Sequence, residues 1–175
     1  ALSCPVVAEP LPLQCGTLDN HYGPFDYRVD KSKLPVVEHR HFTPSIANLQ
    51  HGESGTLAAD IDYTLRAFPN HHRALLSLVR LGERDRTDKP RGAKYSVECY
   101  LRRAEAFAPD DGVASMLMGI YLMKQGKNAD ALEKFEKAKK DDPNNPNLSY
   151  NLGLAYYRLG RYEEALVEAH RAYAG

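Results

Sequence analysis

Over the last two thirds of the chain, apolar side chains recur at intervals of three and four, the spacing of one helix face. The segments 56–68, 71–82 and 95–107 carry this pattern, and prolines or glycines mark where most of them end. Residues 1–55 lack this periodicity and hold six of the 11 prolines. We therefore expect an irregular, Pro/His-rich N-terminal arm over residues 1–55, with one short helix beginning at Pro44.

The C-terminal part repeats itself at a constant offset, in units 112–145 and 146–175. Glycines and alanines coincide in the two units: Gly119 with Gly153, Gly126 with Gly160, Ala131 with Ala165, and Ala138 with Ala172. Upstream, residues 56–111 read as degenerate helical repeats with an inserted loop near 86–93. The constant offset identifies an array of stacked supersecondary units.

With this offset and these small residues, residues 72–175 resemble the tetratricopeptide repeat family, most closely over 112–175. The resemblance implies an all-α fold, a right-handed solenoid of helix pairs. Residues 1–55 resemble no family. Gly119 and Gly153 are then expected where neighbouring helices approach closely. Gly126 and Gly160 are expected in left-handed turns between helices, a conformation that glycine adopts without steric cost.

The family resemblance also implies a function, because such arrays bind a peptide or a partner helix in a concave groove. The groove candidates are Met116, Ile120, Met123, Tyr150, Asn151, Leu154, Tyr157 and Arg158. Some family members grip a C-terminal carboxylate with lysine and asparagine, and only Asn151 matches that clamp here. We expect an apolar, aromatic groove in a scaffold or assembly factor. The alternative is that these side chains pack on a neighbouring repeat or on the arm.

Composition narrows the class of partner. Lys+Arg and Asp+Glu both number 23, whereas nucleic-acid-binding proteins usually show a basic excess. No apolar run approaches the roughly 18 residues that a membrane span requires. Phosphate-binding loops, dinucleotide fingerprints and nucleophile elbows are absent from the sequence. We therefore expect a protein or peptide partner, no nucleic acid, no integral membrane segment, no cofactor and no enzymatic activity.

Histidines in the arm support an alternative function. His39 and His41 would point to one side of an extended segment, and imidazoles so placed can bind zinc or copper. The protein would then be an exported metal- or small-ligand-binding protein with the repeats as scaffold. The sequence offers no supporting cysteine pair, and histidines in polar loops are more often solvated than ligating.

Two cysteines near the start, Cys4 and Cys15, are expected to form a disulfide, which lasts only in an oxidising compartment. The chain begins with Ala1 and not with methionine, as after removal of a signal peptide. We expect an exported, periplasmic protein. The alternative is a cytoplasmic protein with three separate thiols, Cys99 being the third.

The two ends of the helical array raise a further question of what covers them. Tyr22, Phe25 and Tyr27 bring three rings into six residues, and we expect them to dock on the first helices. A ligand pocket between this segment and residues 68–73 is the alternative. At the other end no closing helix follows Tyr173. We expect either that the natural chain continues or that this end forms a homodimer.

Overall fold

The computed structural model describes residues 10–174, which form α-helices and short 3-10 turns and no strand. The predicted all-α fold is confirmed. Two compact units follow each other along the chain, one ending at Pro109 and the other beginning at Asp110. No helix in the described range combines the length and apolarity that crossing a membrane demands.

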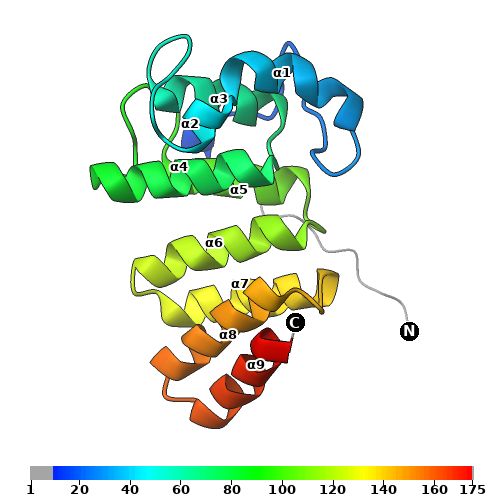
Figure 1. Cartoon of the computed structure of the whole chain (residues 1–175), viewed down its shortest axis with the longest axis vertical. Helices are drawn as coiled ribbons and strands as arrows, with labels where there is room; N and C mark the ends of the chain where they lie inside the picture. Colours follow the sequence, from blue (N-terminus) through cyan, green and yellow to red (C-terminus); the bar gives the residue numbers. More distant parts are fainter. Residues whose placement is uncertain (1–9, 175) are drawn as a thin grey trace. The chain divides into compact units, whose positions relative to one another are not determined.

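Within residues 10–109, the first unit has five α-helices, labelled in Figure 1, and two 3-10 turns. These are η1 (Leu13–Cys15), η2 (Lys31–Lys33), α1 (Leu34–His41), α2 (Pro44–Ala47), α3 (Leu57–Ala67), α4 (His72–Asp85) and α5 (Val97–Phe107). Helix α3 contacts α1, α2 and α4, while α5 contacts α4 and η1. The core therefore forms around the periodic apolar faces of α3, α4 and α5, which the sequence pattern predicts.

Polar side chains fix where the helices of this unit begin. Thr56 accepts a hydrogen bond from the Ala59 amide, and Ser96 accepts one from the Cys99 amide. Such N-caps satisfy backbone donors that have no partner inside the helix. The predicted helices therefore begin near the expected positions.

The arm is more ordered than the sequence analysis predicts, because residues 34–41 form helix α1. Its Leu34 and Val37 are buried in a cluster with Ala67 and Phe68. Only these two positions of α1 are buried, so the segment lacks the repeated apolar spacing by which a helix is recognised in a sequence. Tertiary packing of α1 against α3 stabilises a helix that local sequence hardly signals.

The second unit is a pair of helical hairpins (Figure 1). Its helices are α6 (Gly112–Lys124), α7 (Asn128–Asp141), α8 (Pro146–Arg158) and α9 (Tyr162–Ala174). Helix α6 packs on α7, α8 packs on α9, and α8 also contacts both α7 and α6. Asp111 caps α6, and Asn145, which occupies the equivalent position of the next repeat, caps α8. The structural repeat thus has the period of the sequence repeat.

The glycines of this unit meet two different requirements. Gly126 and Gly160 have φ angles of 77° and 75°, so both predicted left-handed turns are confirmed. A Cβ on Gly119 would lie 2.4 Å from Cε1 of Phe135, which confirms a close approach there. A Cβ on Gly153 would meet nothing nearer than the Ala165 carbonyl oxygen, at 3.4 Å. The two equivalent glycines therefore differ in what they make room for.

Candidate functional site

Helices α8 and α9 border an open hollow of about 750 Å³ within the second unit. We call it the terminal groove. Helix α8 contributes Tyr150, Gly153, Leu154 and Tyr157, and the chain from Tyr162 onward contributes Tyr162, Ala165, Leu166, Ala169, Ala172 and Tyr173. The terminal groove therefore belongs to the last repeat alone.

None of the residues that line the terminal groove carries a charge. Large apolar side chains stand at its border, with Tyr157 63% exposed, Leu166 61% and Tyr173 94%. Exposed apolar side chains gathered on one face mark interaction surfaces more often than isolated ones do. Tyrosine adds contact area and a hydroxyl that can form hydrogen bonds. Chemically, the face can bury an apolar surface and form hydrogen bonds through its tyrosine hydroxyls.

The structure divides the predicted groove residues into three groups. Tyr150, Leu154 and Tyr157 line the terminal groove. Met116 and Met123 are buried, at 8% and 5% exposure, so they are not accessible to a partner. Ile120, also from α6, is partly buried.

The remaining two predicted residues brace α8. The Asn151 side-chain amide donates to the Asn147 carbonyl one turn earlier, at 2.8 Å. The Arg158 guanidinium donates to the Met123 carbonyl at 3.1 Å and so joins α8 to the end of α6. Neither residue lines the terminal groove.

The α9 side of the terminal groove was missed by the sequence analysis, which drew its candidates only from the first helix of each repeat. Leu166 and Ala169 are the clearest examples, because both are exposed in the structure. Their counterparts in the preceding repeat, Leu132 and Phe135, are buried. The signal was available in the alignment of the two units, as the replacement of a phenylalanine by an alanine.

Charged groups lie beside the terminal groove and are engaged with one another. Glu168 is buried, and its carboxylate accepts hydrogen bonds from Lys139 of α7 and from Arg171 at 2.7 Å. The Tyr156 hydroxyl donates to Glu136 at 3.1 Å; burial and that nearby carboxylate raise the pKa of Tyr156. These contacts fix α9 against α7 and α8 against α7.

The two arm histidines proposed as metal ligands do not come together, because α1 is helical there and residues two apart face different directions. The His41 Nδ1 lies 2.9 Å from the Asp60 carboxylate, and the ring stacks on Tyr63. His39 is exposed. Among residues 10–174, no three histidine, cysteine or acidic side chains converge in a way that could hold a metal ion.

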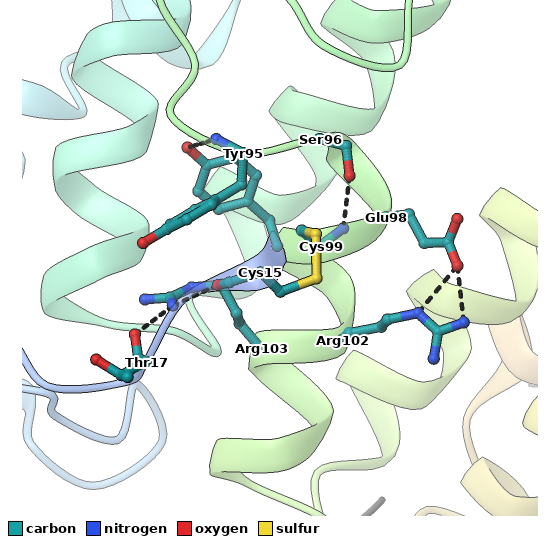
Figure 2. Close-up of a disulfide and its surroundings, with 9 residues drawn as sticks. Cys15, Thr17, Tyr95, Ser96, Glu98, Cys99, Arg102 and Arg103 are labelled. Atoms are coloured by element: carbon teal, nitrogen blue, oxygen red, sulfur yellow. Dashed lines mark hydrogen bonds and ion pairs between the residues drawn. A yellow bond between two sulfur atoms is a disulfide. The ribbon is translucent and has the colours of Figure 1, made fainter. Parts of the chain in front are cut away.

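The expected Cys4–Cys15 disulfide is wrong in its pairing, because Cys15 is bonded to Cys99 (Figure 2). Cys4 itself lies outside the described residues. The bond spans 84 positions and joins η1 to α5, and both cysteines are buried. The disulfide is therefore a long-range link within the first unit and not a local loop in the arm.

Arg103 strengthens the same attachment one turn further along α5. Its buried guanidinium donates to the carbonyl oxygens of Cys15 and Thr17 (Figure 2). The Tyr95 ring lies 4.7 Å from the guanidinium carbon. Burial lowers the pKa of Arg103. A covalent bond and a charged side chain thus hold the same turn of the arm on α5.

The aromatic segment of the arm lies where the sequence analysis expects it. The Phe25 ring packs 5.4 Å from Phe68, and the Tyr27 ring packs 4.3 Å from His71. The Tyr27 backbone amide also donates to Asn70. These rings occupy the surface that the alternative interpretation assigned to a ligand pocket.

Comparison with known proteins identifies the family of the C-terminal repeats. Residues 116–175 match the tetratricopeptide repeat family, which confirms the resemblance for that part of the chain. No curated protein matches the sequence. The solved structure "MamA MSR-1 C2" matches over 86% of this chain and 79% of its own, with a TM-score of 0.53 and 15% identity. That similarity shows a shared fold.

A second solved structure, "MamA AMB-1 C2221", gives a TM-score of 0.49 at 19% identity. The match covers 67% of this chain and 66% of that chain, just under two thirds of the MamA length.

Proposed function

We propose that this protein is a non-catalytic protein–protein interaction module that binds a peptide or helix of its partner in the terminal groove. The observation that carries the proposal is the lining of that groove, which is apolar or aromatic throughout. Tetratricopeptide repeats and a helix-pair fold support a role as an interaction scaffold. We infer that the protein acts as a scaffold or assembly factor.

The chemistry of the groove favours a protein partner over a nucleic acid. Binding to a phosphate backbone depends on lysine and arginine side chains, and none lines the terminal groove. Burial of apolar surface contributes about 25 cal/mol per Å², so an apolar segment of a protein is the ligand that this face can stabilise.

We also propose that the protein works in an oxidising compartment outside the cytoplasm. The Cys15–Cys99 bond supports this location, because disulfides persist there and are rare where thiol reductants keep cysteines reduced.

The proposed function is tested by affinity capture from extract of the source cells, with bound proteins identified by mass spectrometry. Leu166→Ala removes an exposed side chain from the terminal groove. Val167→Ala is the matched control, because Val167 is 50% exposed on the same helix and does not line the groove. We expect to identify a protein that is captured in equal amounts by the wild type and by Val167→Ala. Leu166→Ala should capture at least fivefold less of it. Equal capture by both variants would contradict the proposal.

A further inference from the structure

The first repeat of the second unit contains an aromatic side chain that the last repeat lacks. Phe135 of α7 is fully buried, and its ring lies over Gly119 of α6. Without a Cβ at Gly119 the ring fits between the two helices, since an added Cβ would lie 2.4 Å from it. The ring and the glycine thus form a matched pair.

In the last repeat the glycine is kept and the ring is absent. Gly153 is the equivalent of Gly119, and Ala169 is the equivalent of Phe135. Both line the terminal groove, and Ala169 is exposed where Phe135 is buried. The hollow between α8 and α9 is therefore bordered by Gly153 and Ala169. In the preceding repeat, the equivalents of these two residues are a glycine and the phenylalanine whose ring packs against it.

The preceding repeat also shows what covers such a face. Leu132 is 7% exposed and its equivalent Leu166 is 61% exposed. In the first repeat, helix α8 packs against α7 and α6 and covers that side of the hairpin. Helix α8 presents buried positions at Leu148, Leu152 and Ala155, at helical spacing of four and three. A helix with an apolar stripe of this kind is thus the element that packs on the open side of a hairpin in this array.

We propose that the terminal groove binds an amphipathic helix of a partner protein, which takes the place that α8 takes on the preceding hairpin. The partner helix places one aromatic or similarly bulky apolar side chain in the hollow, against Gly153 and Ala169. This inference rests on the proposed function and specifies its ligand. We infer a bulky side chain because the last repeat has Ala169 where the first repeat has the buried ring of Phe135, and Ala169 borders the hollow.

The probe is a helical peptide of residues 145–159, which contains α8. A hydrocarbon staple replaces Tyr150 and Leu154, which are not among the buried positions of α8. Three further versions carry a phenylalanine on the buried stripe: Leu148→Phe, Leu152→Phe and Ala155→Phe. Binding of each peptide to the full chain is measured by fluorescence anisotropy. We expect at least one phenylalanine version to bind at least fivefold more tightly than the unsubstituted peptide.

The decisive protein variant is Ala169→Phe, which restores the ring that the first repeat has opposite its glycine. We expect it to keep its helical circular dichroism and thermal midpoint, because position 169 is exposed and borders the open terminal groove, where the ring can lie. It should bind the preferred peptide at least tenfold more weakly. Val167→Phe adds the same ring outside the groove and should bind it as wild type does.

Three results would overturn the inference. They are no preference for any phenylalanine peptide, unchanged binding to Ala169→Phe, or a wild-type dimer in sedimentation equilibrium that Ala169→Phe dissociates. The dimer would make a second copy the occupant. If Leu166→Ala still lowers capture of a cellular protein, the proposed function stands without this ligand. If it does not, the proposed function itself fails.

Discussion

The His71 Nε2 lies 2.8 Å from Oε1 of Glu38, which joins the start of α4 to α1. The other ring nitrogen, Nδ1, accepts a hydrogen bond from the Ala74 amide and so caps α4. This pattern requires a neutral imidazole that carries its proton on Nε2 and donates it to the carboxylate. The His71 side chain therefore joins α1 of the arm to α4, and it can make both hydrogen bonds only while its imidazole is neutral.

The pH dependence of the first unit follows from this arrangement. Burial lowers the pKa of His71 to about 4, against the raising effect of Glu38. The unfolded chain binds the proton near pH 6.5, so stability is complete above that value and falls as the pH decreases towards 4. We expect a loss of up to about 3 kcal/mol across this window.

Hydrogen exchange of α3 and α4 peptides between pH 7.5 and 4.5, corrected for intrinsic rates, measures this loss. His71→Asn keeps an acceptor for the helix start and removes the titrating ring. An equal pH slope in the wild type and in His71→Asn would contradict the assignment.

Reduction of the Cys15–Cys99 disulfide should destabilise the first unit. The bond closes a long loop of 84 positions, and loss of a native disulfide typically costs about 2–5 kcal/mol. We expect faster exchange in α5 and in residues 10–22 of Cys99→Ser or of the reduced protein, with the second unit unchanged. Cys4→Ser is the control, and its peptide map should still contain the Cys15–Cys99 pair. A wild-type map with Cys4 joined to Cys15 would refute the pairing.

Replacement by alanine should destabilise the protein at Gly119 and should not destabilise it at the equivalent Gly153. Gly119→Ala forces a Cβ against the buried Phe135 ring and should cost about 1–3 kcal/mol. Gly153→Ala meets only ordinary contacts, and alanine is favoured over glycine within a helix by about 1 kcal/mol. Thermal unfolding followed by circular dichroism should show a lower midpoint for the first variant and an equal or higher one for the second. The same direction for both would be inconsistent with the geometry described.

Glu168 should stabilise the second unit more than any exposed carboxylate of α9. It is buried and accepts hydrogen bonds from Lys139 and Arg171, so Glu168→Ala leaves both cations without this acceptor. We expect a loss of about 1–3 kcal/mol in urea unfolding. Glu164→Ala is the control, because its ion pair with Arg161 is exposed and should change stability too little to detect. Equal effects would show that Glu168 has no structural role.

The repeat could be predicted because its requirements are local and recur. Each helix pair needs a small residue at Gly119 or Gly153 and a left-handed turn at Gly126 or Gly160, so the same letters return at the same place in the next unit. The helix faces follow from periodicity for the same reason.

What could not be predicted depends on contacts between segments far apart in the sequence. The pairing of Cys15 with Cys99 requires η1 to lie on α5, which no spacing rule indicates. The interpretation of His39 and His41 as neighbours assumed an extended backbone, whereas α1 exists because it packs on α3. The groove candidates were taken from the first helices by resemblance, so the α9 residues that line the hollow, such as Leu166 and Ala169, were outside that rule.

Ala169 also bears on how such an array can grow. A further repeat packed on this one would place a helix on α8 and α9, as α8 lies on α6 and α7. The face would then become interior, and a phenylalanine at position 169 would suit it as Phe135 suits the preceding repeat. The side chain at position 169 thus determines whether this face is filled from within the repeat, as by Phe135, or has room for a group from outside it.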